Sequence, residues 1–334
     1  MKAAIYYGVK DIRVEDIPVP ECGDNDVLVK CVRCGICGSD TGSYLIGGHV
    51  GGNAPGRRIG HEMVGYITEV GKNITELNVG DRVFVNPMKA MPLGEADMLG
   101  GFGEYVCVPD AKIGHNIYLL PDHLPYDDAV LIEPFSVGTR GKNVTKVKPG
   151  ENVIVYGVGT IGLCCIASLV AQGIKPIAVV RSNKRKELLE KLGAIVCNTS
   201  EVDLFQFVRE QFGMARARVG YPIPNVDVLV DCAGGPQIPE EFVKMAKSGS
   251  RMAVVAIAKE PRPIPARLMS TEAIIQGSCN FDYDDVMEVI GNLADRKTCI
   301  PEIVTHHFKL EDINEAMLLA GARQEAIKVV IDLE

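Results

Sequence analysis

Hydrophobic and polar residues alternate in short runs along the first 140 residues, and Gly, Pro and Asn separate these runs. Runs of β-branched and apolar residues that are bounded by turn formers are typical of strands. Short strands connected in this way predict a β-barrel or a β-sandwich in this part of the chain. The expected strands are Asp26–Cys31, Met63–Val70, Val79–Val85 and Gly103–Val108.

After Pro149 and Gly150 the pattern changes, because continuous apolar runs now alternate with longer segments of helical character. Apolar runs of this length are consistent with buried strands, and a charged amphipathic segment is typical of a surface helix. Strands that alternate with helices predict βαβ units and a parallel sheet. The expected strands are 152–156, 176–180, 226–230 and 251–257, the expected helices are 161–172 and 183–192, and a final strand is expected at 327–331.

Length and composition agree with two globular domains. The chain has 334 residues, and about 150 residues per domain is a typical size. Hydrophobic residues make up 47% and charged residues 23%, which excludes intrinsic disorder, a collagen-like repeat and a coiled coil. The formal net charge of −8 disfavours binding to nucleic acid or to an anionic membrane, since both select basic patches.

The 11 cysteines indicate a reducing compartment. Their number is odd, and the adjacent Cys164 and Cys165 lie in an apolar run, so a disulfide framework is not expected. The N-terminus has no apolar core of the secretory type, and the apolar run near 161–171 is too short to span a bilayer. We therefore expect a soluble, cytoplasmic protein without a membrane partner.

A glycine-rich segment follows the first expected strand of the second half. Gly157, Gly159 and Gly162 have the G-x-G-x-x-G spacing, and Thr160 and Ile161 lie where the next helix begins. In such a loop the first glycine permits a tight turn, the second lets a pyrophosphate approach the backbone, and the third lets helix and strand pack closely. The helix N-terminus then offers free N–H groups to the phosphates. A chance glycine-rich turn has the same spacing, but the flanking strand and helix favour a dinucleotide site.

The following strand indicates which dinucleotide binds. An NAD site places Asp or Glu about 20 residues further on, where it holds the ribose 2′-hydroxyl. Here the strand is followed by Arg181, Ser182 and then Arg185, with no carboxylate. Guanidinium groups suit a 2′-phosphate, and a basic helix start is unfavourable against the helix dipole unless an anion compensates it. We therefore expect NADP(H) in preference to NAD(H); a solvated helix start is the alternative.

Cys31, Cys34 and Cys37 have the C-x-x-C-x-x-C spacing that is typical of cysteines binding an iron–sulfur cluster. An iron–sulfur cluster needs a fourth cysteine, and the usual Cys-Pro partner does not follow. Cys31 also ends an expected strand, where a thiol packs as a small hydrophobe. The spacing therefore does not predict a cluster.

Cys37 is better explained together with three residues further along the chain. His61 and Glu62 follow it, and Glu133 stands next to Pro134. A thiolate, an imidazole and carboxylates together suit zinc with an open or water-filled coordination position. Each of these residues alone is more often structural, so the prediction of a zinc site depends on their combination.

Seven short motifs follow one another along the chain: GICGSD (35–40), GHE (60–62), VGDRV (79–83), GFGEYV (101–106), EP (133–134), GVGTIG (157–162) and LGA (192–194). Their order and identity resemble the zinc-dependent medium-chain dehydrogenase/reductase family, particularly its sorbitol (polyol), butanediol and threonine dehydrogenase branch. The resemblance covers essentially the whole chain. It implies an α/β protein with a GroES-like, β-rich catalytic domain from residues 1–140 and 281–334 and a doubly wound Rossmann domain from residues 141–280.

The resemblance also implies one catalytic zinc ion at Cys37 and His61. Glu62 would be the third protein ligand, and Glu133 would bind the zinc directly or through its water; which carboxylate binds directly is left open. Asp40 would orient His61, since metal-bound imidazoles usually have such support.

Ser39, Glu62 and Glu133 are the catalytic residues that the resemblance implies, and Ser39 would hydrogen-bond the substrate oxygen. Relatives often carry His five residues after the zinc cysteine as a proton relay, and here that position is Gly42. The proton would instead leave through Ser39, the zinc water and Glu133.

Two further departures from the family pattern limit what carries over. Many relatives bind a second, structural zinc on four cysteines after an Asn-Pro pair, but the segment 88–99 that follows Asn86-Pro87 contains no cysteine. We therefore expect one zinc and no structural zinc. The Arg-Tyr substrate contacts of the polyol branch appear as Asn280-Phe281, which makes sorbitol itself a doubtful substrate.

The implied reaction is reversible hydride transfer between a secondary alcohol and NADP or NAD, which gives a ketone. The expected alcohol is a polyol or a sugar-derived molecule. Two rival hypotheses stay open at this point: a zinc-free quinone or enoyl reductase of the same fold, and a non-catalytic nucleotide-binding protein. The expected partners are a small-molecule substrate and further copies of the chain, as a homodimer or a homotetramer.

Overall fold

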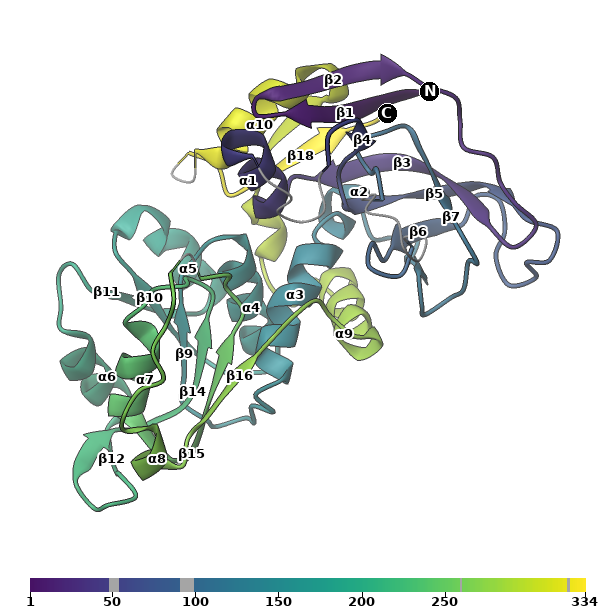
Figure 1. Cartoon of the computed structure of the whole chain (residues 1–334). Helices are drawn as coiled ribbons and strands as arrows, with labels where there is room; N and C mark the ends of the chain where they lie inside the picture. The colour runs from purple at the N-terminus through teal and green to yellow at the C-terminus, as the bar shows by residue number, and fades with distance from the viewer. Residues whose placement is uncertain (48–53, 91–98, 259, 323–324) are drawn as a thin grey trace. The chain divides into compact units, whose positions relative to one another are not determined.

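The computed structural model describes residues 1–47, 54–90, 99–258, 260–322 and 325–334. The chain divides into two compact units, of which unit 1 comprises residues 1–134 and 301–334 and unit 2 comprises residues 135–300. Figure 1 shows the purple N-terminal and yellow C-terminal segments together in unit 1. Unit 1 is therefore built from both ends of the chain.

The units divide six residues before and 20 residues after the boundaries expected at 140/141 and 280/281. Two helices account for the difference, α3 (Ile132–Asn143) and α9 (Tyr283–Ala294). The Lys142 ammonium donates to the Glu288 carboxylate between them, and Glu288 also accepts from Ser168 of α4 (Thr160–Ala171) at 3.0 Å. These polar contacts join α9 and most of α3 to unit 2.

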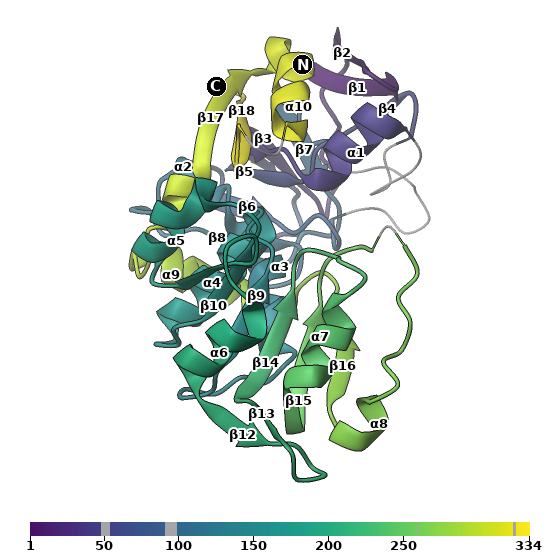
Figure 2. The same cartoon turned by 90° about the vertical axis from the view of Figure 1, so that its left-hand side faces the viewer.

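Unit 1 contains a seven-stranded sheet in which most neighbours are antiparallel and β17 and β18 are parallel. A smaller sheet pairs β1 with β2 and β4. Helices α1 and α10 lie against each other, as both views show (Figures 1 and 2). The strands are β1 (Lys2–Gly8), β2 (Asp11–Asp16), β3 (Val27–Gly35), β4 (Arg57–Arg58), β5 (Glu62–Val70), β6 (Arg82–Val85), β7 (Tyr105–Val108), β8 (Ile117–Leu119), β17 (Val304–Lys309) and β18 (Lys328–Asp332), and the α-helices are α1 (Gly38–Ile46), α2 (Tyr126–Ala129) and α10 (Ile313–Gly321).

The C-terminal strand β18 lies next to β3 in this sheet, and β3 lies next to β5. Val330 is opposite Gly35, and Gly35 is in turn opposite Glu62. Four of the five residues of β18 are buried, so burial of its apolar side chains accounts for its place inside the sheet. This register brings residues from both ends of the sequence to one point.

Unit 2 contains a six-stranded, all-parallel sheet with the strand order β11-β10-β9-β14-β15-β16. The order reverses between β9 and β14, and ligands of doubly wound sheets bind at the carboxyl ends of the strands at such a point. The β12–β13 hairpin lies at one end of the unit (Figure 2). The strands are β9 (Val153–Tyr156), β10 (Ile177–Val180), β11 (Ile195–Asn198), β12 (Met214–Arg216), β13 (Pro222–Pro224), β14 (Val226–Asp231), β15 (Ala246–Val254) and β16 (Ile274–Gly277).

Helices complete the layers of unit 2. Alternate residues of the strands, such as Ile154 and Tyr156 of β9, share a core with Val208 of α6 (Leu204–Phe212) and Phe242 of α7 (Ile238–Met245). Alternation of this kind is expected because successive side chains of a strand point to opposite faces. The remaining helices of the unit are α5 (Lys186–Leu192), α6 (Leu204–Phe212), α7 (Ile238–Met245) and α8 (Leu268–Thr271), with a 3-10 turn at Asn183–Arg185.

The expected fold class is confirmed, and most expected strands are found within a few residues of their predicted bounds. Helix α1 was not indicated by the sequence, because its nine residues include two glycines and few strong helix formers. The Asp40 carboxylate accepts a hydrogen bond from the backbone N–H of Cys37 and so stabilises the start of this helix. All cysteines lie in the described residues, and none forms a disulfide bond. No helix in the described part of the chain has the length and apolar character that a bilayer span requires.

Candidate active site

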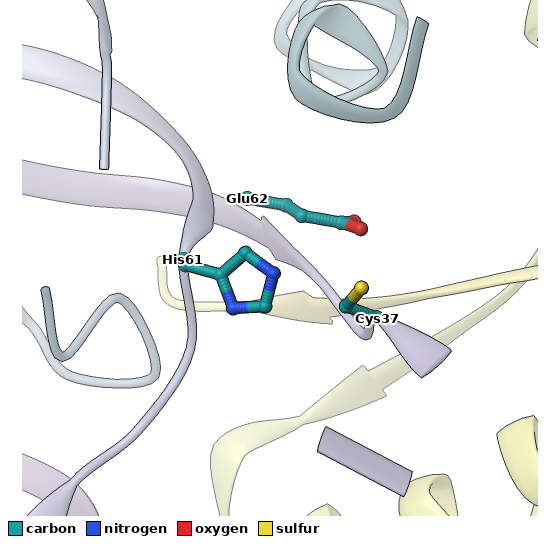
Figure 3. A group of neighbouring side chains, drawn as sticks. All are labelled: Cys37, His61 and Glu62. Atoms are coloured by element: carbon teal, nitrogen blue, oxygen red, sulfur yellow. The ribbon is translucent and has the colours of Figure 1, made fainter. Parts of the chain in front are cut away.

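Three of the expected metal ligands come together in unit 1. Cys37 Sγ, one His61 ring nitrogen and one Glu62 carboxylate oxygen all lie within 4.8 Å of one another. Cys37 immediately precedes α1, His61 immediately precedes β5, and Glu62 is the first residue of β5. Figure 3 shows the three side chains converging, with one imidazole nitrogen facing the thiol and the carboxylate and the other turned away.

Gly60 shapes the backbone that presents His61. Its φ is +96°, a value that L side chains rarely adopt. A Cβ at this position would lie 2.7 Å from the Phe102 backbone nitrogen, which donates a hydrogen bond to the carbonyl of Ile59. The glycine of the GHE motif is therefore required both by its dihedral angle and by the close approach of the neighbouring chain.

Asp40 contacts both Cys37 and His61. One carboxylate oxygen accepts from the Cys37 backbone N–H at 2.9 Å, and the other lies 3.7 Å from His61 Nδ1. The second distance is an ion-pair contact and too long for a hydrogen bond, so the buried Nδ1 has no hydrogen-bond partner among the described residues. Burial alone would lower the pKa of His61, but the nearby Asp40, Cys37 and Glu133 raise this pKa well above its usual value.

Lys328 is a member of the site that sequence reasoning missed. Its ammonium donates hydrogen bonds to the Glu62 carboxylate and to the Ile36 carbonyl, and the lysine is buried. The available signal was a single lysine at the start of the apolar strand 328–331. Lysine is almost never fully buried unless it is paired, but the sequence does not show which carboxylate pairs with it.

Glu133 lies close to the three-residue group without belonging to it. It is buried in the first turn of α3. Burial, followed by the negative charge of Glu62, raises the pKa of Glu133, while His61 and Lys328 oppose the shift. Ser39, the other expected catalytic residue, is half-buried in the first turn of α1.

The chemistry of these side chains fits zinc. A thiolate, an imidazole and one carboxylate form a mixed sulfur, nitrogen and oxygen donor set, and three protein ligands leave a fourth position open, as in catalytic zinc sites. The compact arrangement of the donor atoms, and the ring nitrogen of His61 that faces the thiol and the carboxylate, both agree with a metal bound through that nitrogen. The expectation that no structural zinc is present falls largely on residues 91–98, outside the described residues.

The glycine-rich loop has a different geometry at each glycine. Gly157 has a φ of +85°, which permits the turn after β9. Gly159 precedes α4, and a Cβ there would meet no atom of the described residues within 4 Å. A Cβ on Gly162 would lie 2.0 Å from the Gly157 carbonyl oxygen, so the helix packs directly on the turn. Thr160 and Ile161 form the first turn of α4, whose backbone N–H groups are the expected phosphate donors.

The basic residues after β10 lie beside this loop. Arg185 donates a hydrogen bond from its guanidinium to the Val158 carbonyl, which places its charge next to the glycines. Partial burial lowers the pKa of Arg185. Arg181 and Ser182 are exposed at the end of β10. The structure thus brings Arg185 to the loop and leaves Arg181 and Ser182 at the adjacent strand end.

Comparisons with known proteins support the same interpretation. Residues 23–122 match the family model of the alcohol dehydrogenase GroES-like domain, and residues 160–295 match that of the zinc-binding dehydrogenases. The chain is 31% identical to (R,R)-butanediol dehydrogenase of Bacillus subtilis over 99% of both chains. The chain belongs to the zinc-dependent medium-chain dehydrogenase family, in its polyol dehydrogenase-like branch.

Two further relatives agree with this assignment. Sorbitol dehydrogenase of Bacillus subtilis is 29% identical over 99% of this chain and 97% of its own length. The crystal structure of 2R,3R-butanediol dehydrogenase from Bacillus subtilis has a TM-score of 0.86 and 29% identity, and the match covers 99% of each chain. The resemblance and the combination of a GroES-like with a Rossmann-like domain, both expected from the sequence, are confirmed.

Proposed function

We propose that this family member catalyses reversible hydride transfer between a secondary alcohol and NADP(H), giving a ketone, with one catalytic zinc ion and no structural zinc. The expected alcohol is a small polyol or a sugar-derived molecule. The observation that carries the proposal is the gathering of Cys37, His61 and Glu62 within 4.8 Å in a chain that also has a dinucleotide-type glycine loop.

Cys37, His61 and Glu62 would hold the metal. When bound, the metal supplies a Lewis acid that polarises the substrate oxygen, and the nicotinamide supplies or accepts the hydride. The Asp40 carboxylate lies on the far side of the imidazole and contacts the start of α1, so it keeps the orientations of His61 and Cys37 linked.

The proton of the substrate hydroxyl needs an acceptor, and Gly42 cannot act as one. Ser39 is two residues from Cys37, and its hydroxyl can both accept a proton and donate one. Glu133 is the nearby carboxyl whose pKa is raised by burial and by Glu62, which makes it a better proton acceptor near neutral pH than an ordinary glutamate. We assign the proton route to these two residues.

The cofactor would bind with its pyrophosphate at Gly157, Gly159 and the first turn of α4. Arg181, Ser182 and Arg185 would bind the 2′-phosphate, because they follow β10 where an NAD site has a carboxylate. Guanidinium groups bind phosphate with two parallel hydrogen bonds, which favours NADP(H).

The metal assignment is tested with Cys37→Ser. We expect this variant to lose both zinc and turnover and to keep NADP(H) affinity, because the glycine loop is unchanged. Cys279→Ser, the same substitution at an exposed cysteine, is the matched control and should keep all three properties. Metal analysis, a panel of polyols and other secondary alcohols, and cofactor titration are the measurements. Turnover by zinc-free Cys37→Ser would refute the proposal.

Metal content also separates the rival hypotheses. A zinc-free quinone or enoyl reductase would have no use for a buried thiol, imidazole and carboxylate within 4.8 Å. A non-catalytic nucleotide-binding protein would show no turnover on any alcohol in the panel with NADP⁺. Wild-type protein that binds one zinc ion and oxidises an alcohol excludes both hypotheses.

The cofactor assignment is tested with Arg181→Asp. A hydrogen bond between charged groups contributes about 1.5–3 kcal/mol, so we expect NADP(H) affinity to fall about 10- to 100-fold and NAD(H) affinity to change much less. Arg216→Asp, at another exposed arginine of unit 2, is the control. Unchanged NADP(H) affinity in Arg181→Asp would show that this arginine does not bind the 2′-phosphate.

We also propose that the protein assembles as a homodimer or a homotetramer, as the family resemblance implies. Light scattering coupled to gel filtration measures the mass of the assembly. A mass equal to that of a single chain across the working concentration range would contradict this assignment.

A further inference from the structure

The ion pair between Lys328 and Glu62 is buried on both sides. The two side chains are each 2% exposed, and the ammonium also donates to the Ile36 carbonyl at 2.9 Å. The residues lie 266 positions apart in the sequence. Removing a charged group from water is costly, so a pair with this degree of burial has to be accounted for by what its partners do.

Three adjacent strands define the position of the Glu62 carboxylate. In β3, Gly35 is opposite Glu62 of β5 on one side and Val330 of β18 on the other. A Cβ on Gly35 would come within 2.2 Å of the Glu62 Oε2 oxygen. The carboxylate therefore occupies the space left by the missing side chain of Gly35, and Lys328 donates to the same oxygen.

Without a cation nearby, Glu62 would be a buried carboxylate beside other acidic groups. Asp40, Glu133 and Cys37 surround the site. A buried carboxylate without such a partner is free to turn away from Cys37 and His61, where it cannot serve as a ligand beside them.

We propose that Lys328 is a positioning residue of the metal centre, which holds one oxygen of Glu62 so that the carboxylate faces Cys37 and His61 before the metal arrives. The inference rests on the proposed function, since there Glu62 is a ligand. With metal bound, the ammonium would retain Oε2 and leave the other oxygen of Glu62 for the metal. Lys328 thus acts on the metal through Glu62 and does not touch the substrate.

A purely structural ion pair is the competing explanation, and the chain provides a matched example. Lys142 and Glu288 of unit 2 also form a Lys–Glu pair, with the lysine side chain 3% exposed. Lys328→Met and Lys142→Met make the same substitution in the two pairs. If both pairs are purely structural, the two variants should bind metal alike. If Lys328 is a positioning residue, only Lys328→Met should differ from wild type in metal binding.

The first readout is the absorption spectrum of the cobalt(II)-substituted protein. The positions and intensities of the d–d bands report the number and arrangement of the ligands. We expect Lys328→Met to shift these bands and to change their intensity, because Glu62 is then no longer held toward Cys37 and His61. Lys328→Arg should restore the bands toward wild type, and Lys142→Met should leave them unchanged. A wild-type spectrum for Lys328→Met would overturn the inference.

The second readout is the rise in Tm when zinc is added to metal-free protein. Without Lys328 the Glu62 carboxylate is no longer held toward Cys37 and His61, so we expect the zinc-induced rise in Lys328→Met to be smaller than that of wild type by roughly 5 °C. Lys142→Met should show the wild-type rise, because its pair is not part of the metal site. Equal zinc-induced rises in the two variants would favour a structural role and overturn the inference.

If metal-free Lys328→Met does not fold, the double variant Lys328→Met/Glu62→Gln decides the question. It contains neither buried charge, and replacing both partners of a buried pair is far less costly than removing one. We expect it to fold with weakened metal binding; failure to fold would assign Lys328 a packing role. Wild-type protein without a Cys37-dependent cobalt–thiolate absorption band would instead refute the proposed metal site itself, and the inference with it.

Discussion

Gly159→Ala separates the cofactor role of the glycine loop from its role in folding. Gly159 has a φ of −70° and a ψ of −176°, values that alanine readily adopts, and a Cβ would meet nothing within 4 Å. Replacing Gly159 by alanine raises the free energy of unfolding by about 0.4–1 kcal/mol, because the unfolded chain has less entropy. The substitution lowers it by a similar amount, because glycine is preferred to alanine at the position before a helix. We therefore expect the free energy of unfolding to change by less than about 0.5 kcal/mol.

The same methyl group would stand where a pyrophosphate approaches the backbone. Loss of one hydrogen bond from a backbone N–H to phosphate costs about 1.5–3 kcal/mol, which corresponds to a fall in NADP(H) affinity of about 10- to 100-fold. Titration of NADPH fluorescence measures the affinity, and denaturant unfolding measures the stability. Unchanged NADPH affinity in a folded Gly159→Ala protein would refute this account of the loop.

Two further glycines serve as controls for this experiment. A Cβ on Gly162 would lie 2.0 Å from the Gly157 carbonyl oxygen, so Gly162→Ala should lose stability by at least about 1–3 kcal/mol as well as affinity. Gly291 lies within α9, where a Cβ would meet nothing within 4 Å. Gly291→Ala should raise stability by up to about 1 kcal/mol and leave affinity unchanged.

Two other substitutions test the support around the site and the packing of unit 2. Gly60→Ala would place a side chain at a φ of +96° and a Cβ 2.7 Å from the Phe102 backbone. We therefore expect the free energy of unfolding to fall by at least about 2 kcal/mol and zinc binding to weaken. Wild-type zinc content and stability in this variant would contradict the assigned strain. Lys142→Met should cost about 1–3 kcal/mol near neutral pH, a value reduced for the partial exposure of Glu288. Burial raises the pKa of Glu288, but Lys142 and its other hydrogen-bond donors lower it overall. A carboxyl whose pKa is lower in the folded than in the unfolded protein stabilises the fold at pH values above the unfolded-state pKa, and this stabilisation is lost as the pH falls. The difference in free energy of unfolding between Lys142→Met and wild type, measured in urea, should therefore shrink below about pH 4, and a difference independent of pH would contradict this account.

Local signals in the sequence were sufficient for the nucleotide loop and for the GHE and Cys37 motifs. Each glycine of the loop acts on residues within a few positions of it: Gly157 through its own φ, and Gly162 through the carbonyl five residues earlier. Such short-range constraints recur with a fixed spacing, so the spacing alone predicts them. The same holds for the alternation of strands and helices after residue 150.

Long-range pairing could not be derived in this way. The sequence contains Lys328 in an apolar strand, yet its partner Glu62 depends on β18 pairing with β3 and β3 pairing with β5. The unit boundaries likewise depend on contacts of Lys142 in α3 and Ser168 in α4 with Glu288 in α9; the charged residues of α3 and α9 are typical of solvent-exposed helices when they are considered one at a time.

The sequence by itself determined the family, the two kinds of sheet and the residue types of the metal site, because these depend on local pattern and on motifs with fixed spacing. Only the tertiary structure decided that Glu62 joins Cys37 and His61 in the compact group, that Glu133 remains outside it, and that Lys328 holds the carboxylate. The physical reason is that strand register, which no local pattern specifies, sets the distances between charges from the two ends of the chain.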